Sequence, residues 1–428
     1  MITNTQTQGL DVDSLITSKE SAFNKFLPEA VNKAKGQLAE SSFPTTRTEA
    51  WKYTRTTRIS SAKWSVQQDE SSIPLEEYLI PGLEVNRFVF VNGFYRSDLS
   101  DVEKGEFEFA SFSSADKNDS LIHQWSSDRF FSENVFSLLS LTHATDGLVL
   151  RVKTNAAVTK PFHFILLQTK ENVFANPTIL VECAKGSRST IILSHHQTIS
   201  GKFWLNANIG FSVLENASLN YYKIQEDGEE SFSHIMERVH QDSNSHTNLV
   251  TATLRGGWIR NSLDMLVNGS GCEANLAGAY APMKSEHIDN HTVVDHIRAH
   301  SNSNELYKGV VFDQGRAVFN GKVFVRYQAQ KTNAYQNNAN ITMSDDAVVN
   351  SKPELEIYAD DVKCSHGSTT GQMDEEAIFY LRSRGLSADS AKKLMVSAFL
   401  NDVLDRIDIE ELRNHITNKM IEKGVLLF

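Results

Sequence analysis

The sequence predicts a mainly β protein, a β-solenoid with helical regions at both ends, on three observations. From Gly147 to about Asn350 the chain is a series of short runs rich in β-branched and aromatic residues, with almost no helical pattern between them. Small turn residues recur between the runs, and helical periodicity is found mainly near the two ends. A sandwich or barrel of this length is possible, but a solenoid stacks many short strands more easily, although no repeat of fixed length is visible.

The N-terminal region, residues 1–84, is expected to be helical behind a flexible tail. Met1 to Glu20 is polar and predicts a loose segment. Apolar residues between Ser21 and Leu38 recur at steps of three and four, which predicts an amphipathic helix.

The core region, residues 85–373, opens with a hairpin signal. Two short strand-like runs between Arg87 and Tyr95 flank an Asn92-Gly93 turn. The spacing of apolar residues from Ser120 to Ala144 predicts a helix. Further strands are expected at residues 148–152, 162–167, 178–182, 189–193 and 217–224, and recurring turn sets at 184–187, 215–218, 268–271 and 313–316.

The C-terminal region, residues 374–428, is predicted to hold three helices. Asp374 is placed to cap the first, which should stop at Gly385; Ser387 caps the second, and Asp408 the third. About fifty residues are too few for comfortable stability alone, so these helices should pack on the β region, on a partner, or on both.

Composition excludes several classes of function. The chain has 42 Lys and Arg against 53 Asp and Glu, a net charge of −11. An acidic chain is a poor candidate for nucleic-acid binding or for a polybasic membrane anchor. There is no signal-peptide pattern and no apolar run long enough to span a membrane. We therefore expect a cytoplasmic protein.

The three cysteines are too few for a disulfide framework or for a four-ligand metal site. No permanently bound cofactor is therefore expected. Cys183 is expected to be a small buried residue, whereas Cys272 matches no motif.

Motifs for common enzyme classes are missing. The sequence has no phosphate-binding loop, no Gly-x-Ser-x-Gly elbow and no His-Glu-x-x-His. ATP hydrolysis by this chain, serine-hydrolase chemistry of that type and zincin chemistry are therefore disfavoured.

Two histidine groups have a structural and a functional interpretation. His195-His196 is interpreted as a surface or turn pair. The segment from His287 to His300 holds four histidines and two aspartates, which could bind a metal or form a polar strand-and-turn surface. Because alternate residues of a strand face opposite sides, the four rings need not converge, and the surface interpretation is preferred.

The densest segment for chemistry contains Cys364 and His366. Two residues apart on a strand, they point to the same face and supply one thiolate and one imidazole. That suits iron or zinc but fills half of a tetrahedral shell, so the missing ligands would come from another chain. Lys363 and the nearby imidazole could favour the thiolate. The alternative is a small buried cysteine beside a hydrogen-bonded histidine at a strand end.

Long motifs resemble the SufB/SufD family of iron–sulfur cluster assembly proteins. Three stretches carry the resemblance: Arg47-x-Glu-x-Trp-Lys-Tyr-Thr54, Asp313-Gln-Gly-Arg-Ala-Val-Phe-Asn-Gly321, and Pro353 to Gly367 followed by Phe379-Tyr-Leu-Arg-Ser-Arg-Gly385. Three features favour the SufD branch of the family. They are the modest length, the Trp-Lys-Tyr-Thr motif near the N-terminus, and the Lys-Cys-Ser-His-Gly motif followed by Ser-Thr-Thr-Gly.

The resemblance implies a right-handed parallel β-helix and a role as a non-catalytic scaffold. It implies a complex in which the chain pairs with SufB, each of the two binds the ATPase SufC, and a transient iron–sulfur cluster is built at the SufB interface. Cys364 and His366 match the family's interface residues, with His366 the better candidate for an iron or cluster ligand. An isolated chain could pair with itself through the same edge.

The C-terminal helices would carry the SufC surface, with Leu394, Met395 and Phe399 as possible anchors, although an apolar helix stripe often faces its own domain.

Two other hypotheses stay open. A carbohydrate-active β-helix enzyme could use Asp360 and Asp361 as its carboxylates, which would have to converge in a groove. A purely structural solenoid would need neither Cys364 nor His366.

Overall fold

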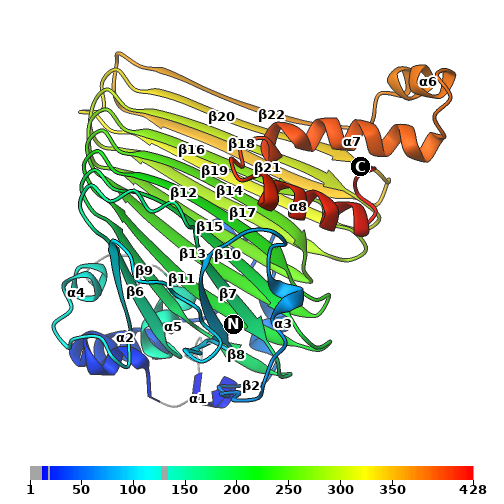
Figure 1. The fold of residues 1–428 in the computed structure, drawn as a ribbon. Coiled ribbons are helices and arrows are strands. Elements are labelled where there is room, and N and C mark those ends of the chain that lie inside the picture. Colours follow the sequence, from blue (N-terminus) through cyan, green and yellow to red (C-terminus); the bar gives the residue numbers. More distant parts are fainter. Residues whose placement is uncertain (1–11, 18–19, 127–133, 428) are drawn as a thin grey trace, which may run out of the picture.

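The fold is a parallel β-solenoid, seen in a computed structural model that describes residues 12–17, 20–126 and 134–427. Two long sheets lie face to face, and through most of the core successive strands alternate between them (Figure 1). Each of these strands pairs in parallel with the strand two positions later in the chain, as residues 203–213 do with residues 231–241. The mainly β, solenoidal fold class predicted from the sequence is confirmed.

The strands divide between the two sheets as follows. The first sheet contains β1 (Ile16–Thr17), β2 (Trp64–Ser65), β5 (Phe107–Ser111), β6 (Gly147–Val152), β8 (Val173–Ala175), β9 (Thr178–Cys183), β11 (Phe203–Val213), β13 (Ser231–Gln241), β15 (Trp258–Val267), β17 (His287–His296), β19 (Arg316–Val325) and β21 (Val348–Ile357). The second contains β3 (Asn86–Val91), β4 (Phe94–Tyr95), β7 (Phe162–Gln168), β10 (Arg188–Gln197), β12 (Ser218–Glu226), β14 (His246–Arg255), β16 (Glu273–Tyr280), β18 (Asn302–Val311), β20 (Asn333–Thr342) and β22 (Lys363–Gly371).

Helices gather near the two ends of the chain. They are α1 (Val12–Leu15), η1 (Ala22–Lys25), α2 (Pro28–Glu40), η2 (Glu49–Trp51), α3 (Thr57–Ser60), η3 (Glu76–Tyr78), α4 (Ser120–Ser126), α5 (Val135–Thr142), α6 (Glu375–Ser383), α7 (Ala388–Leu404) and α8 (Glu410–Glu422). None of the described helices is both long and apolar enough to cross a membrane.

One corner of the solenoid repeats from coil to coil. A residue with left-handed backbone stands at this corner in successive coils: Asn155, Gly186, Asn216, Asn244, Gly271, His300 and Lys331. Its N–H donates to the next coil, as Asn216 does to the Ser243 carbonyl at 3.0 Å. Glycine and asparagine adopt this conformation most easily. The small turn residues noted in the sequence at 184–187, 215–218 and 268–271 therefore mark this corner.

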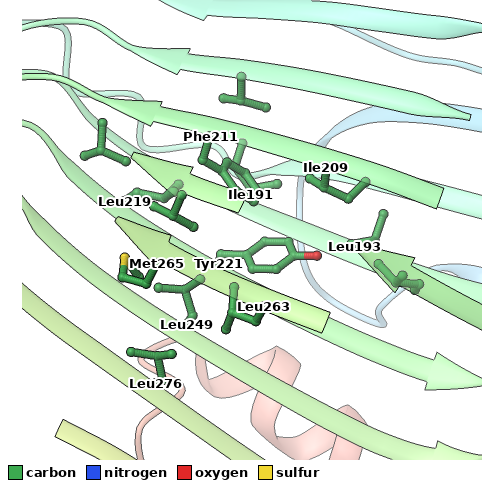
Figure 2. Packing of buried hydrophobic residues seen from close by; sticks show 14 of the residues in the cluster. Ile191, Leu193, Ile209, Phe211, Leu219, Tyr221, Leu249, Leu263, Met265 and Leu276 are labelled. Carbon is green, nitrogen blue, oxygen red and sulfur yellow. The ribbon is translucent and has the colours of Figure 1, made fainter. Parts of the chain in front are cut away.

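The space between the sheets is filled by alternate side chains of each strand. Figure 2 shows apolar residues of successive coils meeting there, among them Ile191, Phe211 and Leu249, all buried. The interior is not wholly apolar, since the buried Lys223 ammonium lies 2.6 Å from the Glu237 carboxylate. Burial of apolar surface supplies most of the stabilisation, at roughly 25 cal/mol per Å².

The elements predicted before residue 145 are confirmed with changes. The hairpin forms as β3 and β4, with left-handed Asn92 and Gly93 in the turn. The helix expected over 21–38 splits into η1 and α2, because Pro28 is favoured at the first position of a new helix. The helix expected over 120–144 is seen as α4 and α5, with 127–133 outside the described residues. Of the expected loose tail, 1–11 and 18–19 are also outside them, whereas β1 pairs with β2.

The C-terminal helices α7 and α8 pack on the second sheet, in line with the expectation that this region packs on the β region, on a partner, or on both. Buried residues of α7 and α8 form one cluster with buried residues of that sheet, while α6 projects away (Figure 1). Asp374 and Ser387 cap α6 and α7 through their side chains. The capping role predicted for Asp408 is wrong. The residue before α8 is Ile409, and the Asp408 N–H instead donates to the Tyr222 hydroxyl at 3.2 Å.

Candidate functional site

Cys364 and His366 lie on β22, the last strand of the second sheet. Cys364 is in register with Ala334 of β20, and His366 with Gln336. Cys364 packs against the interior cluster, and Ser368 donates to Ser351 across the sheets at 2.8 Å. Because alternate residues share a face, His366 lies on the interior side of β22 between these two. The shared face expected for Cys364 and His366 is thus observed.

Both sheets end in open strands at this end of the solenoid. Within the described part of the chain, β22 pairs only with β20, and β21 only with β19. Ile357, at an interior position of β21 that a further coil would cover, is 42% exposed. Free strand edges with apolar side chains favour pairing with another chain.

The ligand set at this site is incomplete. Among the described residues, no three His, Cys, Asp or Glu side chains gather closely enough to hold a metal. One thiol and one imidazole supply half of a tetrahedral shell. The remaining donors would therefore have to come from a chain that covers the open end.

The expectation that Lys363 and the imidazole favour a Cys364 thiolate is wrong. Desolvation raises the pKa of Cys364 above its usual value, partly offset by the Ala334 backbone. Lys363 precedes Cys364 on the strand, so its side chain lies on the opposite face. The Cys364 thiol therefore gives up its proton less readily than a fully exposed cysteine does.

The three predicted anchors on α7 are half-buried rather than free. The Phe399 ring packs against the second-sheet cluster, with the Lys308 ammonium 4.5 Å from its centre. Leu394 and Met395 lie one turn earlier and are also half-buried. Phe399 therefore belongs in part to the chain's own core.

Sequence reasoning missed two aromatic side chains on the neighbouring α6. Phe379 is 72% exposed and Tyr380 56%, the former among the most exposed large apolar residues of the described chain. Ile378 takes the buried side of the same helix. Three consecutive apolar residues cannot all face one side of a helix, and this is the signal in the sequence that could have found them.

The histidines between His287 and His300 do not converge. His296 points inward and bonds Ser303 at 2.9 Å, whereas His287 and His291 face the N-terminal segment on the outer side of β17. His300 occupies the left-handed corner. The preferred interpretation as a polar surface is wrong in one respect, since most of the segment is covered.

The Trp-Lys-Tyr-Thr motif explains that covering. Thr54 donates to the buried Asp289 carboxylate at 2.5 Å, and Arg260 forms an ion pair with the same carboxylate. The Arg260 guanidinium lies 3.8 Å from the centre of the Trp51 ring. Desolvation alone would raise the pKa of Asp289, but the charge of Arg260, the nearby histidines and the Thr54 hydrogen bond together hold this pKa below its usual value. This motif anchors the N-terminal segment to the solenoid.

The interpretation of His195-His196 as a surface pair is also wrong. Both residues lie on β10 and are buried. His195 contacts the Asp227 carboxylate, and His196 lies 3.1 Å from that of Glu226. Lys419 of α8 approaches Glu226 as well, so His196 lies near the C-terminal helices, whereas His195 points into the solenoid beside the Phe203 ring.

The remaining candidates have structural surroundings. Cys183 is buried as expected, and burial raises its pKa to about 11. The thiol of Cys272 is buried 3.1 Å from the Asp242 carbonyl. Asp360 and Asp361 lie in the turn between β21 and β22, where Asp361 forms an ion pair with Lys331. This turn gives the sugar-cleaving hypothesis no support.

Comparisons with known proteins agree with this geometry. The model of the SufBD core domain, described as SUF system FeS cluster assembly, matches residues 165–399, and that of the SufBD protein N-terminal region matches residues 13–164. The iron–sulfur cluster assembly protein SufD of Escherichia coli is 30% identical over 388 residues, 89% of each chain. A SufBD family iron–sulfur cluster assembly protein of Synechocystis is 28% identical over 407 residues, covering 90% of this chain and 89% of its own. The chloroplastic protein ABCI7 of Arabidopsis thaliana is 27% identical over 412 residues, covering 91% and 84%.

Proposed function

The chain belongs to the SufBD family of the SUF system for iron–sulfur cluster assembly, and from this premise we propose that it is the SufD-type scaffold subunit of a complex with SufB and SufC. In this proposal the chain is not itself an enzyme. A transient cluster is assembled where its open end meets SufB, and SufC hydrolyses the ATP that drives the assembly. The missing phosphate-binding loop supports placing ATP hydrolysis in a partner.

One observation carries the proposal: Cys364 and His366 share the interior side of a terminal strand whose edge is free. Iron and sulfide are the cargo of the site. In this proposal His366 is the main iron ligand of the chain, because burial disfavours the Cys364 thiolate. A SufB chain paired against this end would cover the exposed apolar residues and supply the other ligands.

The proposed SufC surface is centred on α6. The exposed rings of Phe379 and Tyr380 support this placement, and the half-buried Leu394 and Met395 extend it onto α7. Exposed aromatic side chains are common anchors of protein interfaces. Phe399 contributes less, because its ring already packs against the second sheet.

Substitution of His366 tests the cluster site. We expect His366→Ala to leave the fold intact, since the side chain is exposed, and to lower cluster yield in the reconstituted complex by about tenfold or more. Cluster yield would be followed by iron and sulfide content and by visible absorption.

The matched control is Ser365→Ala, the outward neighbour on the same strand. Equal cluster yields for His366→Ala and wild type would remove His366 from the site.

Substitution of Phe379 tests the SufC surface. We expect Phe379→Ser to weaken SufC binding by about tenfold or more, the usual effect of losing an aromatic anchor, while the fold stays intact. Calorimetric titration with purified SufC measures this. Ile199→Ser, an exposed apolar residue on a loop of the solenoid, is the control. Undiminished binding by Phe379→Ser would place the SufC surface elsewhere.

A further inference from the structure

A ladder of polar side chains runs inside the solenoid and ends at His366. The strand register stacks Glu305 of β18, Gln336 of β20 and His366 of β22 at the same position of three successive coils. Neighbouring strands lie about 4.8 Å apart, so adjacent rungs are within reach of a hydrogen bond. Glu305 and Gln336 are both 2% exposed.

The hydrogen bond between the two buried rungs fixes which way the Gln336 amide faces. Gln336 Nε2 donates to Glu305 Oε2 at 2.7 Å. The oxygen of the same planar amide, Oε1, is buried and has no hydrogen-bond partner among the described residues. A buried acceptor without a partner is costly, and the next rung beyond it is His366.

Gly321 on the facing strand β19 gives this amide its room. A Cβ at Gly321 would lie 2.4 Å from Gln336 Nε2 and 2.6 Å from the Phe319 ring. Gly321 is not among the glycines with left-handed backbone. The glycine that ends the Arg-Ala-Val-Phe-Asn-Gly stretch is therefore required by the space that the Gln336 amide needs rather than by its own conformation.

We propose that Glu305 and Gln336 are positioning residues that hold the imidazole of His366 in one tautomer and one orientation at the open end. In this arrangement the exposed His366 side chain turns so that a ring N–H donates to Gln336 Oε1, the acceptor that has no partner in the described part of the chain, and the other nitrogen is left free to face the iron of the cargo. The inference rests on the proposed role of His366 as a ligand.

The carboxyl group of Glu305 anchors the ladder. Burial raises the pKa of Glu305 to about 7. Its Oε2 atom can accept from Gln336 whether the group is charged or neutral. The ladder therefore does not depend on the ionisation of Glu305.

Nitrogen NMR of the imidazole rings in the full-length isolated chain tests the ladder. The His366 signals are assigned by their loss in His366→Ala. We expect one dominant neutral tautomer in the wild type, and a shift of the tautomer ratio by about fivefold in Gln336→Leu, the effect of losing one hydrogen bond. Gly321→Ala should shift the ratio in the same direction, because the new methyl group displaces the amide. Asn337→Leu, the exposed neighbour on β20, should leave it unchanged.

The outcomes separate the ladder from the proposed function. An unchanged His366 tautomer ratio in folded Gln336→Leu and Gly321→Ala would overturn the ladder. If Gln336→Leu does not fold, the ratio measured in the milder variant Gly321→Ala decides the question. A shifted ratio together with full cluster yield for His366→Ala would support the ladder and reject the cluster site. An unchanged ratio together with low cluster yield for His366→Ala would reject the ladder and keep the site.

Discussion

The two ends of the solenoid are built from similar strands and finished differently. At the N-terminal end, β6 is almost wholly buried and α5 lies over the first sheet, every one of its residues buried. At the C-terminal end, β21 and β22 contain no buried residue. Solenoids normally close both ends to remain soluble. An end left open thus indicates a surface that another chain covers.

The side chains that point into the solenoid differ in polarity between its two ends. On β6 they include Leu148, Leu150 and Val152, whereas β22 presents Cys364, His366 and Ser368 on its interior side. An apolar interior stabilises the closed end by excluding water. The polar interior of the open end contributes little stability but offers metal donors and hydrogen-bonding groups.

The largest loss of stability is expected from a substitution at the closed end. Phe136 is fully buried and stacks on Trp51 at 4.9 Å. We expect Phe136→Ala to lower the free energy of unfolding by about 3–5 kcal/mol through the lost packing and the cavity. Urea denaturation followed by circular dichroism measures it. A loss below about 1 kcal/mol would show that the cap over the first sheet is not tightly packed.

The second-largest loss of stability is expected at low pH, through protonation of the buried His296. Burial lowers the pKa of His296 to about 4. Its folded pKa is below the value near 6.5 of an unfolded chain, so its contribution to stability is complete above pH 6.5 and is lost as pH falls towards 4, by roughly 3 kcal/mol in all.

A pH series of urea denaturations checks this on His296→Gln, whose unfolding free energy should fall less steeply between pH 6.5 and 4 than that of the wild type. Glu305 has the opposite sign, because its raised pKa costs stability as pH rises from about 4.5 to 7. The comparison is therefore made between variant and wild type. Identical slopes would contradict a depressed pKa for His296.

The smallest change in stability is expected at the open end. Ile357 occupies an interior position of β21, yet it is 42% exposed because no further coil covers it. Ile357→Ser should cost about 1 kcal/mol or less. It should nevertheless weaken the proposed pairing with SufB by about tenfold or more, measured by calorimetry with Tyr53→Ser as an equally exposed control. Normal pairing would show that this end is not the SufB surface.

Local chemistry in the sequence predicted the strands, the corners and most caps. The solenoid's period could not be read, because the corner residue changes from asparagine to glycine to His300 and Lys331. Ser387 was predictable as a cap because its partner, the Ser390 N–H, is three residues away. Asp408 was not, because its partner Tyr222 lies on a strand far away in the chain.

At the candidate site too, local features were predicted from the sequence, whereas contacts between coils were not. Alternation along a strand placed Cys364 and His366 on one face correctly. Their surroundings depend on residues of other coils, so the raised pKa of Cys364 and the ladder through Gln336 and Glu305 were beyond reach of local patterns. His195 and His196 were misplaced for the same reason, since the facing sheet buries His195 and α8, far away in the chain, lies near His196.

The order of coils along the chain also sets the order of synthesis. The closed end is made first, and each later coil can fold onto the one before it as the chain leaves the ribosome, because contacts in a solenoid are between neighbours. β22 and α6 are among the last segments to emerge. An incomplete nascent chain therefore lacks both His366 and Phe379, and the proposed SufB and SufC surfaces are complete only when translation ends.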